Sequence, residues 1–266
     1  MSLAPEHRTD IAASRHAHLL AALLDHDTPP WRPGELPPLG HWLLFPPDTR
    51  QSGIGPDGHP IREDDSLPRR MWAGSRVRFL APIMLGSEVA RETVVVATDD
   101  KEGRSGRMRF VTLRHILKVD GHSCVEEEQD IVYRAAGRNG AAPPPETLAP
   151  APSVARVVTI DPVQLFRFSA LTFNAHRIHY DLPYTQTVEG YPGLVVHGPF
   201  IATLLMDHFL RHAPTAQVES FSFRAQRPIF GGEPFTLGLS PQDTGGELMA
   251  IDHAGGLAMQ AHVKSR

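Results

Sequence analysis

One short segment of the chain carries its densest group of side chains able to do chemistry. The polar members of residues 174–181 are Asn174, His176, Arg177, His179, Tyr180 and Asp181. His179 can accept or release a proton near neutral pH, whereas Asn174 can only donate and accept hydrogen bonds. The two lie five residues apart across an expected bend from helix to loop, so they could meet at one water molecule. The alternative is that Asn174 merely ends the preceding helix and His179 lies on the surface.

A second chemical feature follows eighteen residues after His179, in the sequence His197-Gly198-Pro199-Phe200. Proline fits the first turn of a helix because its missing N–H has no helical partner there. Gly198 has no side chain, so a ligand can approach its backbone N–H at the positive end of the helix dipole. Such a donor can hold a carbonyl oxygen on which negative charge develops. A plain helix start without any ligand is the alternative.

Other reaction classes find little support. His176, His179 and His197 lie close in sequence, but they match no zinc spacing such as HExxH, so we expect no metal site. Patterns of the GxSxG and phosphate-loop types are absent from the sequence. Cys124 is the only cysteine, which excludes an internal disulfide and a CxxC redox motif.

The composition is that of an ordinary globular protein. Of the 266 residues, 41% are hydrophobic and 21% are charged, and the formal net charge is −4. No basic stripe is present, so a nucleic-acid partner is not expected. No apolar run reaches the roughly 18–20 residues of a membrane helix, and no signal-peptide pattern follows Met1. We therefore expect a cytoplasmic protein with no membrane partner.

Periodicity predicts the elements around the two features. In the second half we expect a strand over 155–160, a helix over 161–172 capped by Asp161, an irregular segment over 173–196 and a buried helix over 199–211. Strands are then expected over 217–226, 233–240, 247–252 and 257–264. In the first half we expect a helix over 9–26 capped by Thr9 or Asp10, a long loop over 27–70, and strands over 77–79, 89–98, 108–119 and 125–133.

The chain divides at a segment rich in proline and alanine. Residues 137–153 have the composition of a semi-extended linker, so we expect domains over 1–136 and 154–266. A weak repeat supports two similar units, because residues 78–86 match residues 224–232 at an offset of 146 with four of nine positions identical. Chance remains an alternative for so short a match.

Residues 165–210 resemble the MaoC-like enoyl-thioester hydratases and dehydratases. Their signature, D-x-N-P-x-H-x-D followed by V-x-H-G, corresponds here to residues 174–181 and 195–198. The sequence of this segment resembles one branch of the family, which holds the mesaconyl-C4-CoA hydratases, itaconyl-CoA hydratases and mitochondrial type 2 hydroxyacyl-thioester dehydratases. His41-Trp42 and residues 68–74 resemble the same branch. The resemblance implies an α+β double hot dog fold, with two curved antiparallel sheets each wrapped around a central helix. It also implies a degenerate first domain (1–136), which fits the absence of a visible central helix there, and a MaoC-like second domain (154–266).

The resemblance also implies roles for individual residues. His179 takes the place of the catalytic histidine, and Gly198 that of the amide that binds the thioester oxygen. Asn174 stands where many members have aspartate, so we expect it to orient water rather than carry a proton, with Asp181 or Glu189 as a second titrating group. The further residues expected to contact substrate are Val196, Arg177, His197, Tyr180 and Asp181.

The function implied is a hydro-lyase that reversibly adds water to a short enoyl-CoA, of the mesaconyl-C4-CoA or itaconyl-CoA type. Such acyl groups carry a second carboxylate, for which an arginine fork is a natural partner; the candidates are Arg69, Arg70, Arg167 and Arg177. Trp42 and Trp72 could line the acyl groove or simply pack in the core. No cofactor is expected, and two chains are expected to pair as a homodimer. The alternatives are a dehydratase acting on 3-hydroxyacyl carrier-protein thioesters and a non-catalytic thioester-binding protein.

Overall fold

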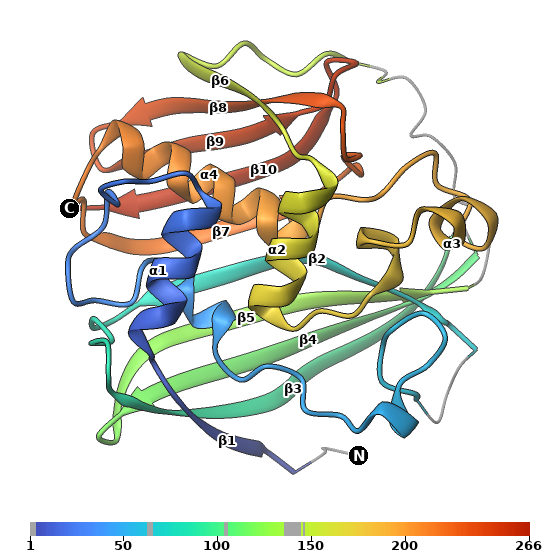
Figure 1. The fold of residues 1–266 in the computed structure, drawn as a ribbon, viewed down its shortest axis with the longest axis horizontal. Coiled ribbons are helices and arrows are strands. Elements are labelled where there is room, and N and C mark those ends of the chain that lie inside the picture. Colours follow the sequence, from blue (N-terminus) through green and yellow to red (C-terminus); the bar gives the residue numbers. More distant parts are fainter. Residues whose placement is uncertain (1–3, 63–65, 104–105, 136–144, 146) are drawn as a thin grey trace.

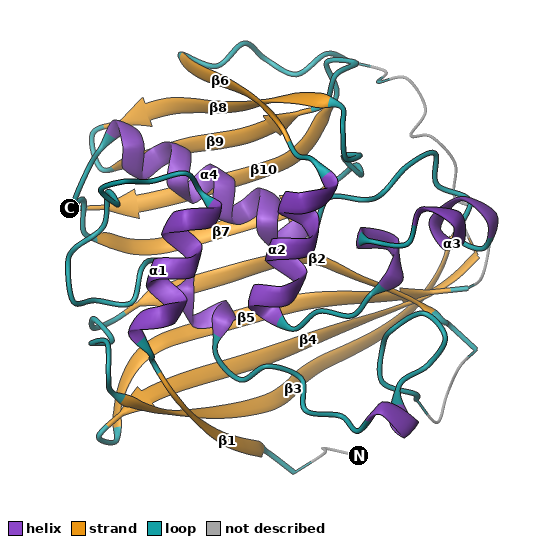
Figure 2. Ribbon diagram, viewed as in Figure 1, coloured by secondary structure: helices purple, strands orange, loops and turns teal. Residues whose placement is uncertain are grey.

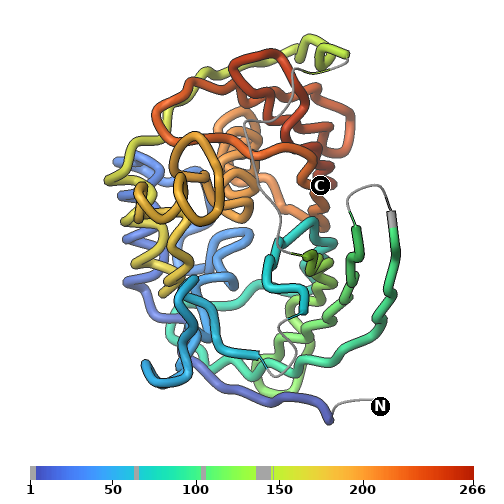
Figure 3. Tube along the Cα trace, turned by 90° about the vertical axis from the view of Figure 1, so that its right-hand side faces the viewer, coloured from blue at the N-terminus to red at the C-terminus, as the bar shows by residue number. Residues whose placement is uncertain are grey.

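The backbone forms one large antiparallel sheet in the computed structural model, which describes residues 4–62, 66–103, 106–135, 145 and 147–266. The sheet has ten strands in the order β1-β3-β4-β5-β2-β7-β10-β9-β8-β6. Its helices lie against one face (Figures 1 and 2). The side view shows the curved sheet on one side of the molecule and the helices on the other (Figure 3). This is the α+β double hot dog expected from the sequence, with its two sheets joined edge to edge.

The first half supplies one side of this sheet. Its elements are β1 (Glu6–Ile11), α1 (Ser14–Leu23), the 3-10 turns η1 (Gly40–Leu43) and η2 (Gln51–Gly53), β2 (Arg69–Phe79), β3 (Glu88–Gly103), β4 (Gly106–Val119) and β5 (His122–Arg134). The second half supplies the other side with β6 (Val154–Thr159), α2 (Pro162–Thr172), the 3-10 turn η3 (Arg177–His179), α3 (Leu182–Thr187), α4 (Gly198–His212), β7 (Val218–Ala225), β8 (Pro234–Gln242), β9 (Gly245–Ile251) and β10 (Leu257–Ser265). The halves meet where β2 pairs with β7, from Gly74–Arg224 to Arg78–Ser220.

Helix α4 is the centre of the core. Every residue from Phe200 to Leu210 is buried, as the nearly uninterrupted apolar sequence predicts. The helix packs against β8, β9 and β10 of its own half and against β2 of the other half. This contact with β2 fixes the N-terminus of α4 at the boundary between the halves, where the chemical residues are expected.

Matching backbone hydrogen bonds show that the two halves share one backbone arrangement. Leu80 N and Ala81 N both bond to Cys124 O, and at the offset of 146, residues 226 and 227 both bond to Ala258 O. Leu36 N bonds to Ile83 O at 2.8 Å, and Val196 N bonds to Ile229 O at 2.8 Å. The weak sequence repeat therefore marks a structural repeat.

The repeat has one unequal position. Helix α1 corresponds to α2, because each follows the edge strand of its half. The segment after Leu36, which corresponds to Val196 at the start of α4, forms only the short turn η1. Thus the first half departs from the expected pattern of one central helix per sheet, which explains why no such helix is visible in its sequence.

Two local predictions were wrong. The predicted N-terminal helix starts later, because Glu6–Ile11 form strand β1, and its N-cap is Ala13 rather than Thr9 or Asp10. The Asp10 carboxylate instead accepts hydrogen bonds from Ile11 N and Phe45 N. The strand expected at Val77 begins at Arg69. The domain boundary at 137–153 stays a prediction, because residues 137–144 and 146 lie outside the described residues.

Candidate active site

Helix α2 ends so that Asn174 faces the site. Asp161 caps the start of the helix through a capping box with Gln164. At its end, Phe173 takes a left-handed conformation with φ of 50°, which turns the chain out of the helix. The Asn174 Oδ1 then accepts a hydrogen bond from His176 N at 2.9 Å, which fixes the side chain and leaves its NH₂ group as the remaining donor.

His179 is held in one orientation by the backbone. It lies in turn η3, and its side chain is 6% exposed. Its Nδ1 lies 2.7 Å from Val195 O, so Nδ1–H is the donor and Nε2 is left without the proton. Val195 N in turn bonds to Ile178 O at 2.9 Å, which ties the histidine turn to the strand-like segment before α4. The arrangement leaves Nε2 as the basic nitrogen.

Histidine rings surround this position. The His179 ring stacks on the His197 ring with centroids 3.5 Å apart, and His176 meets His179 edge-on at 5.4 Å. His59, from the first half, lies 4.2 Å from the His176 ring. The stack places His179 directly beside the residue that precedes Gly198.

Burial keeps these histidines neutral. Desolvation lowers the pKa of His179 to about 4; the hydrogen bond to Val195 O acts in the opposite direction, and the charge of His59 lowers the pKa further. Burial also lowers the pKa of His59 to about 4 and that of His176 to about 2. The pKa of His197 is held well below its usual value, again mainly by burial. At neutral pH the His179 imidazole is therefore a free base.

Gly198 begins helix α4. The N–H groups of a first helical turn have no acceptor within the helix, and the helix dipole makes them favourable anion donors. A Cβ added at Gly198 would meet only Trp72 O, at 3.8 Å, so there is open space beside its backbone. His197 is anchored by Ser169, whose Oγ lies 2.9 Å from His197 Nε2. These contacts fix the Gly198 amide next to His179.

A chamber of about 710 Å³ opens beside the two groups. Its wall includes Phe168, Asn174, Arg177, Tyr180 and Pro199 from the second half. His179 and Gly198 lie behind this wall, next to lining residues, rather than forming it. A chamber of this size is within the range of small-molecule sites. Its first-half wall is formed by Trp42, Pro47, Thr49, Gln51, Ile54, Gly55, Pro56, Gly58, His59, Pro60, Arg70, Trp72 and Gln129.

The first half covers the histidine segment with one loop. Arg177 N bonds to Asp57 O at 2.9 Å, and Arg177 Nη1 bonds to Pro56 O at 2.9 Å. Gly58 lies at the closest approach, with φ of +91°, where an added Cβ would lie 1.8 Å from Ala175 O. Only glycine fits this contact. The long loop predicted over 27–70 is therefore part of the site.

Comparisons with known proteins identify the family of this chain. A family model described as hydroxyacyl-thioester dehydratase type 2 matches residues 39–231. The chain belongs to this family. It is 45% identical over 260 residues to the mesaconyl-C(4)-CoA hydratase of Chloroflexus aurantiacus, which covers 96% of this chain and 92% of that protein. It is 26% identical to the mitochondrial hydroxyacyl-thioester dehydratase type 2 of Schizosaccharomyces pombe, over 90% of this chain and 88% of that one.

Solved structures share the fold of this family member. A MaoC-like dehydratase from Phytophthora capsici superposes with a TM-score of 0.71 at 14% identity, covering 99% of this chain and 94% of that one. HtdX of Mycobacterium tuberculosis gives a TM-score of 0.68 at 18% identity, covering 98% and 100%. The MaoC-like architecture expected from the sequence is confirmed.

Other residues of the segment support its shape. Asp181 caps α3 by accepting from Tyr184 N at 3.0 Å and pairs with Arg177 at 2.6 Å, so its pKa is lowered, first by the backbone hydrogen bond. Glu189 pairs with Arg69 at 2.9 Å. Both carboxylates proposed as a second titrating group are thus engaged in ion pairs. Tyr180 OH donates to Ala175 O at 3.0 Å within the same segment.

Some predicted contacts lie one layer away from the chamber. Val196 and His197 are 2% and 1% exposed, so their side chains lie behind its wall, and their contact with substrate stays a prediction. Trp42 and Trp72 do line it, with ring centroids 5.1 Å apart. Trp42 Nε1 donates to the buried Glu127 carboxylate at 3.0 Å, and Trp72 Nε1 donates to Gly74 O at 2.9 Å, so both indoles are fixed.

Sequence reasoning missed His59. His59 lies in the long loop predicted over 27–70, and nothing in the spacing relates this loop to a histidine segment more than a hundred residues later. The described residues contain no group of three or more His, Cys, Asp or Glu side chains placed to hold a metal ion. Among the helices of the described residues, none has the length and apolarity to span a membrane.

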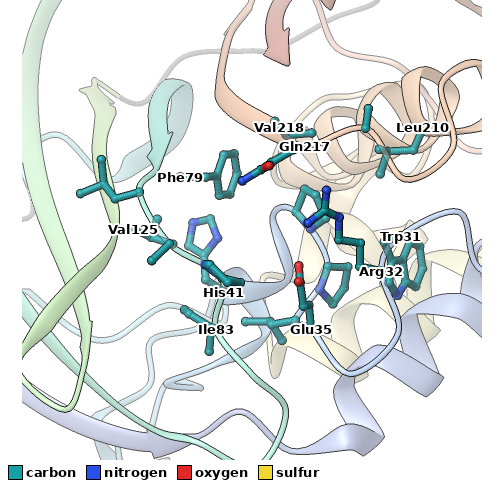
Figure 4. Close-up of a pocket in the computed structure, with 17 residues that line it drawn as sticks. Trp31, Arg32, Glu35, His41, Phe79, Ile83, Val125, Leu210, Gln217 and Val218 are labelled. Atoms are coloured by element: carbon teal, nitrogen blue, oxygen red, sulfur yellow. The ribbon is translucent and has the colours of Figure 1, made fainter. Parts of the chain in front are cut away.

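A second hollow occupies the corresponding place in the first half. It measures about 100 Å³ and lies between η1 and the beginning of β7 (Figure 4). Leu36, Pro37 and Pro38 line it. Leu36 makes the bond that matches that of Val196, so, counting along the chain from there, Pro37 and Pro38 correspond to His197 and Gly198. The first-half segment therefore has no histidine–glycine pair, although Arg32, Glu35 and His41 also line this hollow.

Proposed function

We propose that this chain is a hydro-lyase that reversibly adds water to the double bond of a short enoyl-CoA thioester of the mesaconyl-C4-CoA type. The observation that carries the proposal is the position of His179, with a free Nε2, stacked on the residue before the Gly198 amide. A general base and an oxyanion donor side by side are what addition of water to an unsaturated thioester requires. The 45% identity to a mesaconyl-C(4)-CoA hydratase supports the substrate type.

The thioester oxygen accepts a hydrogen bond from the Gly198 N–H at the start of α4. Water attacks the β-carbon, its oxygen forms the new C–O bond, and His179 Nε2 takes its proton. The π electrons of the double bond move toward the thioester, where the enolate oxygen develops negative charge. Loss of one such donor typically costs about 3–4 kcal/mol of barrier.

One histidine can serve both proton transfers. The imidazolium formed when His179 accepts the proton of water is a strong acid at this buried position, because burial lowers its pKa to about 4. It can return the proton to the α-carbon, which completes the addition and regenerates the free base. Asp181 and Glu189, which are held in ion pairs, are then not needed. Asn174 orients the water through its amide, as its fixed side chain allows.

The partner of the enzyme is an acyl-CoA thioester, and we propose that it acts in the cytoplasm as a homodimer. The carrier-protein form of the substrate is a second candidate, favoured by the 26% identity to a mitochondrial hydroxyacyl-thioester dehydratase. The same residues would catalyse dehydration of a 3-hydroxyacyl thioester by the reverse steps.

A substrate screen tests the proposal. The purified protein is incubated with mesaconyl-C4-CoA, itaconyl-CoA, crotonyl-CoA and crotonyl carrier protein, and the loss of the enoyl-thioester absorbance is followed. Hydration of mesaconyl-C4-CoA supports the proposal, whereas a preference for the carrier-protein substrate supports the second candidate. Binding of these thioesters without turnover of any would contradict an enzymatic role.

A further inference from the structure

We propose that Arg70 binds the distal carboxylate of the acyl group and so selects thioesters of dicarboxylic acids. This inference rests on the proposed function, because it assumes that the acyl chain occupies the chamber beside His179. It assigns one residue among the four arginines that sequence analysis offered as carboxylate partners.

The structure separates those four arginines. Arg69 forms an ion pair with Glu189 at 2.9 Å, and Arg177 forms one with Asp181 at 2.6 Å. Arg167 lies on an exposed position of α2 and is not part of the chamber wall. Arg70 lines the chamber, and within the described residues no ion pair or hydrogen bond joins its side chain to an acidic group. Arg70 is therefore the cation available to a ligand.

The position of Arg70 follows from strand β2. β2 pairs with β7 only between Gly74 and Arg78, so the part of β2 before Gly74 extends past the end of β7. Arg70 and Trp72 are two residues apart on this part, and both side chains line the chamber. Trp72 O is the nearest atom, at 3.8 Å, to a Cβ built on Gly198, so β2 passes the start of α4 at Trp72. Arg70 lies two residues along the strand from that point, a backbone span of roughly 7 Å, and lines the same chamber.

The electrostatic effect of Arg70 on its neighbours agrees with this location. The charge of Arg70 contributes to the lowered pKa of both His59 and His176, so it lies near the rings that adjoin His179. These rings are neutral and add no competing charge. Asp57 is the acidic neighbour of His59, and its Oδ1 accepts from His59 N at 3.0 Å, within its own turn. A guanidinium in such a partly buried wall favours a planar anion that can accept two hydrogen bonds.

Binding of two unreactive thioesters tests the inference apart from catalysis. Succinyl-CoA has a distal carboxylate, and butyryl-CoA has a methyl group in its place. The unaltered protein should bind succinyl-CoA more tightly than butyryl-CoA in titration calorimetry. Arg70→Met should weaken binding of succinyl-CoA by about 10–100-fold, the usual range for loss of a charge-assisted hydrogen bond, and change butyryl-CoA binding by less than about twofold. Arg70→Lys should keep part of the preference.

Arg78→Met is the matched control. Arg78 lies on the same strand, is exposed and pairs with Glu126 at 2.8 Å, so the variant should bind both thioesters as the unaltered protein does. Equal weakening of both thioesters by Arg70→Met would overturn the inference, since it would place Arg70 on the CoA moiety or on the fold. Unchanged binding of both would overturn it as well. Hydration of mesaconyl-C4-CoA by the unaltered protein reports on the proposed function separately, whatever the Arg70 variants bind.

Discussion

The two halves of this protein build the same frame and use it differently. In each half an edge strand is followed by a helix. In each half a later segment then hydrogen-bonds to the backbone near the sheet, through Leu36 N in the first half and Val196 N in the second. In the second half the segment continues into α4 and carries His197-Gly198. In the first half it continues into η1 and carries Pro37-Pro38.

The difference between the halves shows what the chemistry needs beyond the fold. Proline has no N–H, so Pro38 cannot donate the hydrogen bond that we assign to Gly198. The connection after α1, residues 24–39, is also shorter than the segment after α2, residues 173–197, which carries Asn174 and His179. At the offset of 146, Val218 at the start of β7 and Ala216 just before it stand in place of Trp72 and Arg70. The first half has the same backbone arrangement and contributes one wall of the chamber, and the second half carries the groups to which we assign the chemistry.

The largest effect is expected from the histidine that the first half lacks. His179→Gln should lower kcat/KM for mesaconyl-C4-CoA by about 10²–10⁴-fold, the usual contribution of a general base. Glu35→Gln, in the first-half hollow, is the matched control and should leave kcat/KM within about twofold. Both rates are measured by enoyl-thioester absorbance. A His179 variant of normal activity would contradict the assignment of the base.

Substitution of Gly198 by proline removes its backbone N–H, as Pro38 lacks one in the first half. Gly198→Pro removes the N–H and should lower kcat by about 10²–10³-fold if the amide binds the developing oxyanion. Gly198→Ala keeps the N–H, and its added Cβ would meet only Trp72 O at 3.8 Å, so its loss should be clearly smaller. Circular dichroism checks that both variants fold. Equal losses in the two variants would argue that the N–H has no role.

Substitutions of Asn174 test whether its amide orients water. Asn174→Ala removes both the amide that orients water and the acceptor of His176 N, and should lower kcat by about 10–100-fold, the range for one or two lost hydrogen bonds. Asn174→Asp keeps the acceptor and adds a group that can carry a proton, so it should retain more activity than Asn174→Ala. Steady-state kinetics at neutral pH measure both. Unchanged turnover in Asn174→Ala would show that the side chain orients nothing.

The smallest change is expected from pH. The pKa of His179 is lowered to about 4 by burial, so the base stays neutral and kcat/KM should be constant from about pH 8 to about pH 5. The same shift affects stability. The unfolded chain takes up protons near the ordinary pKa of 6.5 and the folded chain only near 4, so stability falls as pH decreases through this window. A loss of activity centred near pH 6.5, with melting temperature unchanged, would contradict this account.

The sequence predicts most of the second half. The capping of α2 by Asp161, the burial of α4 and the strands after it all follow from local periodicity and cap chemistry, and the structure confirms them. Local patterns could not reveal β1, because six residues of mixed polarity at a sheet edge resemble the start of the helix that follows. They also could not show that the sheets join through β2 and β7, since that contact depends on tertiary packing.

The sequence indicates the second-half residues of the candidate site but not the first-half residues that complete its wall. His179, Asn174 and Gly198 lie within 25 residues of one another, and their types alone indicate acid–base and oxyanion chemistry. His59, Trp42 and Arg70 come from another half of the molecule, and only the docking of the loop around Gly58 brings that half to the histidines. Separation of the four candidate arginines also required their ion pairs, which no sequence spacing specifies.

A crystal structure with bound succinyl-CoA would show whether His179 and Gly198 face one acyl group. We predict that the thioester oxygen lies about 2.7–3.1 Å from Gly198 N, with the acyl carbons beside His179 Nε2. An acyl group found in the first-half hollow between Leu36 and Val218, or beyond reach of His179, would contradict it.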